Sequence, residues 1–369
     1  MDIPNIVHSM KEWQYNFSPV SREEWIKQIE ADLRQKPVES LQSEWWPGEP
    51  LIPLVHAEDT PGEIVRLPDS LFINPPRITE WINTPFSSNQ QINKRILDAL
   101  HYGSQSIILQ VHSLVEIFAA EWIRDVHTEM ITLQIQPNYF EPDNLPHLLK
   151  KIPAFALIRS VRGKTSEPLS TLISWVLNND TEAIKPVRFV YEFPVEGNWA
   201  LETAETFKLI LQDLSQWKSA GLNAAVFFEK CILRVEADQE YFKQIIQTRT
   251  IHLLWQNIIQ VNEIGTLVED VQYMEFHIEQ KEGETSDHFL IRSSTSALAA
   301  SLAGPHSLCI HQAETEGTPE FYRRINRNIH HLLELESSMY KSTDPLAGAY
   351  ALDFHTKRWV KEIWDILSL

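Results

Sequence analysis

A short amphipathic pattern predicts a helix near the start of the chain. Ser21 is followed three residues later by Glu24, the spacing of a capping box in which each side chain binds the other residue's backbone amide. Trp25, Ile29 and Leu33 then recur every four residues, so they share one face of the helix and form one apolar stripe.

Proline dominates the segment that follows this helix. Eight prolines lie between residues 36 and 76, a density that excludes long helices and central strands. We therefore predict that residues 1–76 form an extended arm with one helix, wrapped against a neighbouring surface. Four tryptophans of the arm would suit such contact: Trp13, Trp25, Trp45 and Trp46.

From residue 77 onward, short apolar runs alternate with amphipathic helical patterns. Gly103 and Gly221 each stand between a helical pattern and an apolar run, where a glycine can end a helix in the left-handed conformation. Alternation of this kind is typical of a parallel sheet, and eight repeats match the usual size of a (β/α)8 barrel. The eight predicted strands are residues 77–82, 106–111, 131–136, 154–160, 187–193, 224–232, 271–279 and 307–313.

The predicted architecture is an α/β fold, a (β/α)8 TIM barrel over residues 77–340. The extended N-terminal arm 1–76 precedes it, and a turn with a C-terminal helical extension at 341–369 follows it. An open, doubly wound sheet is the alternative. The absence of GxGxxG after the first strand argues against a dinucleotide-binding version of that sheet.

A specific turn is predicted at KSTDPLAGAYALD, residues 341–353. Asp344 can cap the backbone, Pro345 fixes φ, and Gly348 permits a sharp bend. The turn would direct the chain off the barrel toward the last helix. An ordinary turn of aspartate and proline, with no further role, is the simpler interpretation.

Charge and composition narrow the possible partners. The formal net charge is −18, and an acidic chain is a poor ligand for nucleic acid or anionic lipid. The two cysteines lie in apolar runs, which indicates buried, reduced thiols. The first residues lack a signal-peptide pattern, and no apolar run approaches the ~20 residues that span a bilayer. We expect a soluble, cytoplasmic protein.

Few residues stand out as candidates for chemistry. The motifs HExxH, CxxC and GxxxxGK[ST] are absent, and we predict no metal site. In a barrel, chemistry lies at the C-terminal ends of the strands. There, Arg159 could bind a substrate phosphate or carboxylate, or pair with an internal glutamate. His311 is a second candidate for substrate binding and His277 a weaker one, with barrel-interior histidines bonded to a neighbour as the alternative.

Four segments resemble the methylmalonyl-CoA mutase family. DPLAGAYALDFHTKRWVKEIWDIL (344–367) resembles the segment that ends the family's barrel domain, and FYRRINRNIHHLLELES (321–337) resembles the helix before it. EEWIKQIEADLRQKPVESL (23–41) is similar to the family's N-terminal opening, and residues 220–255 are similar to its sixth strand and helix. The resemblance runs from about residue 11 to the end, and it fits the small, non-catalytic subunit better than the catalytic one.

The resemblance implies a barrel pierced by the CoA tail, adenosylcobalamin radical chemistry, and isomerisation of methylmalonyl-CoA and succinyl-CoA. This sequence departs from it at the expected catalytic histidine after the fifth strand, where Pro194 stands. We expect no cobalamin domain after the barrel, and DVHTEM (125–130) lacks the glycine of the family's DxHxxG loop. We therefore predict no catalytic residues, no cofactor bound by this chain, and inactivity of the chain alone.

The predicted strands are rich in aromatic residues, which suggests that bulky rings fill the barrel axis and leave no room for a CoA tail. The aromatic residues concerned are Phe189, Tyr191, Phe193, Phe227, Phe228 and Phe276, and Met274 adds further bulk.

These observations favour a barrel scaffold that pairs, as a heterodimer, with a catalytic large subunit carrying adenosylcobalamin. A homodimer is possible for the isolated chain. The alternatives are an active split mutase with a separately encoded cobalamin domain, and a CoA-ester-binding protein without catalysis.

Overall fold

The computed structural model divides into two compact units, Met1–Glu63 and Ile64–Leu369, and each is considered by itself. The boundary between them falls within the predicted arm 1–76. The described residues are 18–46, 49–60, 62, 64–83, 88–113, 120–127, 130–139, 157–161, 169–178, 187–194, 197–262, 274–312 and 320–368.

The first unit contains the predicted helix, α2 (Arg22–Asp32), and the capping box of Ser21 and Glu24 is formed. The Arg22 Nε donates to Asp59 Oδ1 at 2.6 Å, which joins the helix to the end of the unit. Trp25 is only half-buried, with its ring 5.6 Å from that of His56, so the apolar stripe is incompletely covered within this unit.

The rest of the first unit is short and irregular, as the proline content predicts. Strands β1 (Ser43–Trp46) and β2 (Glu49–Leu51) pair antiparallel. Two 3-10 turns complete it, η1 (Val38–Leu41) and η2 (Ala57–Asp59). Trp13 lies outside the described residues.

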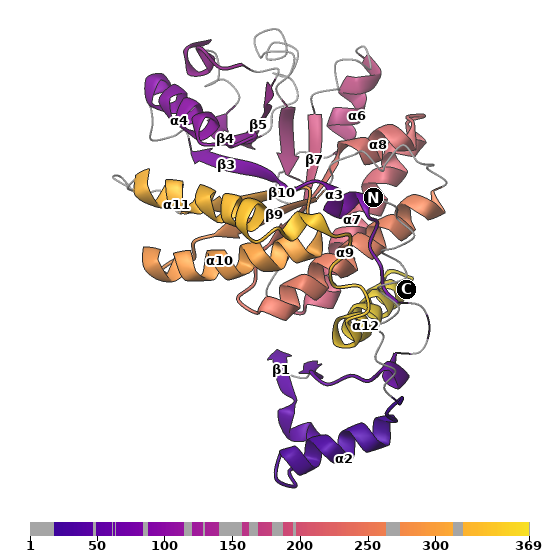
Figure 1. Cartoon of the computed structure of the whole chain (residues 1–369). Helices are drawn as coiled ribbons and strands as arrows, with labels where there is room; N and C mark the ends of the chain where they lie inside the picture. Colours follow the sequence, from indigo (N-terminus) through magenta and orange to yellow (C-terminus); the bar gives the residue numbers. More distant parts are fainter. Residues whose placement is uncertain are drawn as a thin grey trace, which may run out of the picture. The chain divides into compact units, whose positions relative to one another are not determined.

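The second unit is a closed barrel of eight parallel strands, which confirms the predicted fold (Figure 1). The strands follow one another in sequence order, and the last closes on the first where Ser307 pairs with Arg77. The strands are β3 (Arg77–Asn83), β4 (Ser106–Ser113), β5 (Thr132–Tyr139), β6 (Leu157–Val161), β7 (Val187–Phe193), β8 (Cys231–Glu236), β9 (Met274–Glu279) and β10 (Ser307–His311).

Helices cover the outside of the barrel. Gly103 and Gly221 have φ of 95° and 78°, so both take the predicted left-handed conformation after a helix. The α-helices of this unit are α3 (Ser70–Ile73), α4 (Asn89–His101), α6 (Leu169–Asn178), α7 (Trp199–Ser219), α8 (Ala224–Lys230), α9 (Tyr241–Val261), α10 (Ser286–Ala303), α11 (Glu320–His331) and α12 (Tyr350–Leu367). Shorter helical segments are the 3-10 helices η4 (Ala120–Ile123) and η10 (Met339–Lys341) and the π-helix η9 (Leu332–Glu336).

One predicted strand is wrong in most of its length. Residues 224–230 of the expected strand 224–232 form α8, and β8 begins only at Cys231. The Asn223 side chain accepts a hydrogen bond from the Ala225 amide at 2.8 Å and so starts a helix. Short apolar runs of this length do not distinguish a strand from a buried helix by periodicity.

The aromatic residues of β7 face the helices, not the barrel axis. The Tyr191 hydroxyl donates to Asp213 of α7 at 2.9 Å, and the Phe193 ring lies 5.1 Å from Phe207 of the same helix. Side chains alternate along a strand, so Val190 and Glu192 point inward instead. The prediction that aromatic rings fill the axis is therefore wrong, and Phe227 and Phe228 lie on α8 outside the barrel as well.

The turn at residues 341–353 holds two distant segments together. The Arg249 guanidinium of α9 and the Leu67 amide both donate to the Asp344 carboxylate, which is almost completely buried. Gly348 has φ of 84°, as the predicted bend requires. Asp344 thus caps a backbone amide far away in sequence, which gives the turn a structural role beyond a change of direction.

Candidate functional site at the barrel mouth

A buried ion pair occupies the middle of the barrel. The Arg159 guanidinium of β6 binds the Glu275 carboxylate of β9 through two hydrogen bonds, at 2.8 and 2.7 Å. Arg159 also donates to the side chains of Gln134 and Gln136 of β5, at 2.5 and 3.1 Å. Burial opposes the charge of Glu275, but Arg159 and His277 hold the pKa of that carboxyl well below its usual range.

A second polar layer lies nearer the C-terminal ends of the strands. The Arg234 guanidinium donates to Glu192 Oε1 and to Gln136 Oε1, each at 2.5 Å. His277 lies beside it, with Nε2 3.3 Å from Glu275 Oε2. Burial and the charge of Arg234 lower the pKa of His277 to about 4, so its imidazole is neutral at pH 7.

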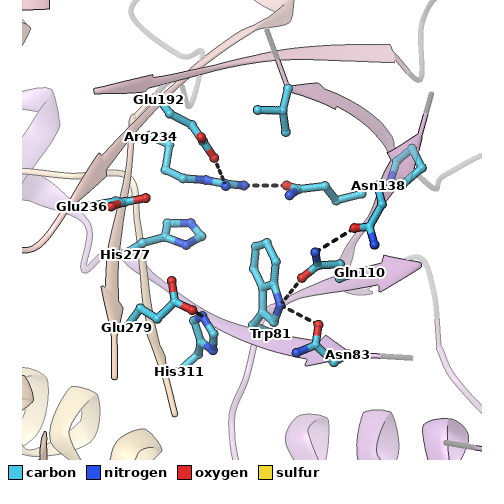
Figure 2. Close-up of a pocket in the computed structure, with 13 residues that line it drawn as sticks. Trp81, Asn83, Gln110, Asn138, Glu192, Arg234, Glu236, His277, Glu279 and His311 are labelled. Atoms are coloured by element: carbon cyan, nitrogen blue, oxygen red, sulfur yellow. Dashed lines mark hydrogen bonds and ion pairs between the residues drawn. The ribbon is translucent and has the colours of Figure 1, made fainter. Parts of the chain in front are cut away.

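Above these layers, the barrel mouth holds a cavity of about 350 Å³, within the usual range for small-molecule sites (Figure 2). It is lined by Trp81, Asn83, Gln110, Gln136, Pro137, Asn138, Val161, Glu192, Arg234, Glu236, His277, Glu279 and His311.

Trp81 of β3 stands in the middle of this cavity, where Figure 2 shows carboxamides on one side and ionisable groups on the other. Its Nε1 donates to Gln110 Oε1 at 3.1 Å, and Gln110 donates in turn to Asn138 Oδ1 at 2.9 Å. The His311 ring stacks against the indole ring, with their centroids 5.4 Å apart, and Cζ of Arg234 lies 5.3 Å from the indole centroid. Trp81 is therefore held in one orientation by contacts on several sides.

The opposite wall carries an excess of negative charge. Three glutamates line it, Glu192, Glu236 and Glu279, against the single guanidinium of Arg234 among the described lining residues. Glu279 Oε1 lies 3.3 Å from His311 Nε2, and the hydrogen bond from His311 lowers the pKa of Glu279. The lining has two more negative than positive charges when its histidines are counted as neutral.

The two predicted substrate-binding residues have different surroundings. His311 lines the cavity, whereas Arg159 is fully buried beneath it in the ion pair with Glu275. This ion pair is the alternative that the sequence left open for Arg159, namely pairing with an internal glutamate. His277 also lines the cavity. Pro194 directly follows β7, and strand alternation places it on the same side as Glu192.

Sequence reasoning missed several lining residues, among them Trp81 and Glu279. The sequence could have indicated them, because side chains alternate along a strand and every second residue near a strand end points inward. Trp81 and Asn83 are two residues apart at the end of β3, and His277 and Glu279 have the same spacing at the end of β9.

Neither thiol is suited to nucleophilic chemistry. Cys231 and Cys309 are buried and free, as predicted, and burial raises the pKa of each. Among the residues that the structure describes, no group of three or more His, Cys, Asp or Glu could hold a metal ion. Within the same residues, no helix has the length and apolar character needed to cross a membrane.

The fold and this site define a class: a parallel (β/α)8 barrel with charged side chains along its axis and a polar cavity at its mouth. Residues 197–369 match the family model described as Methylmalonyl-CoA mutase. A protein from Porphyromonas gingivalis named methylmalonyl-CoA mutase small subunit is 25% identical over 95% of this chain. Over residues 197–369 the chain is therefore similar to the methylmalonyl-CoA mutase family.

The relatives are longer than this chain. It spans 62% of the length of the Porphyromonas gingivalis protein. A methylmalonyl-CoA mutase from Escherichia coli is 37% identical, over 21% of this chain and 11% of its own length. Among solved structures, dihydropteroate synthase from Xanthomonas albilineans is 14% identical, covering 71% of this chain and 93% of its own, with a TM-score of 0.42. That likeness is too distant to bear on ligand or reaction.

The sequence departs from the loop that would hold adenosylcobalamin in the manner that the resemblance implies, since Met130 stands where that loop has a glycine. The nearest match to the cobalamin-binding loop is the segment of His127, which is exposed and precedes β5. It therefore lies at the N-terminal end of the barrel, opposite the cavity.

Proposed function

We propose that this chain is a non-catalytic barrel subunit that binds and stabilises a catalytic methylmalonyl-CoA mutase chain. The partner would carry adenosylcobalamin and perform the isomerisation of methylmalonyl-CoA and succinyl-CoA. The name of the Porphyromonas gingivalis relative supports the pairing, since a small subunit implies a larger one.

The ion pair of Arg159 and Glu275 is the observation that carries this proposal. It lies on the barrel axis, where the CoA tail of a family substrate would run. Both side chains are buried, with exposed fractions of 0% and 7%. Separating such a pair costs about 3–5 kcal/mol, because each charge would lose its partner in a site shielded from water. A CoA tail would have to displace it.

The cavity above the ion pair is also poorly suited to the family substrate. Methylmalonate and succinate carry a free carboxylate, and the excess of glutamates at the mouth would repel it. Pro194, with neither a side-chain donor nor a backbone N–H, cannot polarise a thioester carbonyl from the end of β7.

Co-expression with a catalytic mutase chain from the same organism tests the pairing. We expect an equimolar complex on gel filtration and a higher unfolding temperature for the catalytic chain in the complex. This chain alone, supplied with adenosylcobalamin and methylmalonyl-CoA, should show no turnover. Failure of the two chains to associate would contradict the proposal.

An active split mutase, or a CoA-ester-binding protein, is the second candidate, and one observation favours it. His277 and His311 place two imidazoles at the barrel mouth, although on β9 and β10 instead of after β7. Calorimetric titration of the isolated chain with succinyl-CoA separates the candidates. The scaffold predicts no binding, whereas stoichiometric binding would favour the second candidate. Turnover on mixing with an isolated cobalamin domain would identify the split enzyme.

A further inference from the structure

We propose that the cavity at the barrel mouth binds a small organic ammonium compound, an alkylamine with a second polar group at its other end. This role is independent of the pairing proposed above. It rests on three features of the cavity: its closed floor, its charge, and the arrangement of its two walls.

The floor limits the size of the ligand. Arg234 and His277 form the inner surface of the cavity, and the pair of Arg159 and Glu275 lies directly beneath them. Arg234 is itself fixed by Glu192 and Gln136, so the floor is rigid. A volume of about 350 Å³ above this floor suits a compact molecule without a long tail.

The charge of the lining selects a cation. Glu236 and Glu279 are exposed at the mouth, where a solvated ligand would first meet the protein. A concave site with an excess of negative charge, here two more negative than positive groups, concentrates cations. The positive group of Arg234 is already engaged by two acceptors at 2.5 Å, so it offers little attraction to an anion.

The carboxamide wall suits the other end of such a molecule. Gln110 and Asn138 are joined by a hydrogen bond, and Asn83 accepts from the Trp81 Nε1 at 3.4 Å. Each carboxamide carries two donors and an acceptor with two lone pairs. A hydroxyl or a second amine can therefore bind here while the ammonium group faces the glutamates across Trp81 (Figure 2).

Three ligands of equal carbon chain length provide the test: putrescine, butanediol and succinate, which differ in charge but little in size. We expect calorimetry on the full chain, at near-physiological ionic strength, to show one site for putrescine. Butanediol should bind more weakly and succinate not at all. A preference for succinate, or equal affinity for all three, would overturn the proposal.

Matched substitutions distinguish the site from a general attraction of cations to an acidic protein. Glu236→Gln and Glu279→Gln each remove one charge from the mouth with little change of shape. Each should weaken putrescine binding about three- to fivefold, as expected for exposed ion pairs. The control Glu39→Gln removes an equal charge from an exposed position in the other unit and should leave the affinity unchanged. Equal weakening by the control would show non-specific binding only and overturn the proposal.

Discussion

The guanidinium of Arg249 binds the carboxylate of Asp344 through two hydrogen bonds, at 2.7 and 3.0 Å, with neither side chain exposed to solvent. The same pair binds the chain before the barrel, because Arg249 donates to the Val65 carbonyl and Asp344 accepts from the Leu67 amide. One ion pair thus fastens α9, the entry segment and the C-terminal turn.

Asp344→Asn should be strongly destabilising, because it leaves the Arg249 charge buried without its counter-charge. We expect a loss of about 3–5 kcal/mol in the free energy of unfolding, measured by urea denaturation. The exposed Asp365 of α12 provides the matched control, and Asp365→Asn should change stability by less than about 0.5 kcal/mol. Equal losses of stability in the two variants would contradict a stabilising role for the ion pair of Arg249 and Asp344.

Mutations of Arg159 and Glu275 should have non-additive effects on the free energy of unfolding, because the two side chains form one buried ion pair. Arg159→Met and Glu275→Met should each cost about 3–5 kcal/mol, since each leaves one buried charge uncompensated. The double variant should lose clearly less than the sum, because no buried charge of the pair remains. Denaturation of all four proteins gives the coupling free energy, and strict additivity would show that the two side chains do not depend on each other.

Stability should fall in mild acid because His277 is buried in its neutral form. The unfolded chain binds this proton near pH 6.5, whereas the folded chain binds it only near its lowered pKa of about 4. Between these pH values the unfolded state holds more protons, so the free energy of unfolding decreases as the pH falls. His277 accounts for about 3 kcal/mol of this loss. Urea titrations across this range should show a shallower slope for His277→Gln, and an unchanged slope would contradict the assignment.

Both thiols should resist modification in the native protein. Cys231 and Cys309 have exposed fractions of 1% and 0%, and burial raises the pKa of each, so little thiolate is available. Titration with a thiol-reactive disulfide reagent should detect neither cysteine in the folded chain and both in urea. Rapid reaction of either thiol in the folded chain would show that its surroundings open to solvent.

The strands of the barrel were largely predictable because they are apolar on the outer face and bounded by helix-ending glycines such as Gly103. The start of the sixth strand was not predictable. Residues 224–230 are as apolar as a strand, but they form a helix whose first turn is capped by the Asn223 side chain. Only contact with neighbouring helices distinguishes the two, as in the packing of Phe228 against Trp255 of α9.

The content of the barrel axis could not be inferred from the aromatic residues alone. In β9, Met274 and Phe276 alternate with Glu275 and His277, and either set could face inward. An apolar interior is the usual arrangement, but here the charged set is inside because Arg159 from another strand neutralises Glu275. That pairing joins residues 116 positions apart, and no local pattern reveals it.

The closure of the barrel between Ser307 and Arg77 has a consequence for biosynthesis. Strand β3 leaves the ribosome long before β10, so the growing sheet has two open edges through most of translation. Unpaired edges readily add strands from other molecules. We therefore expect products that terminate before β10 to be prone to aggregate, because both edges of their sheet stay unpaired.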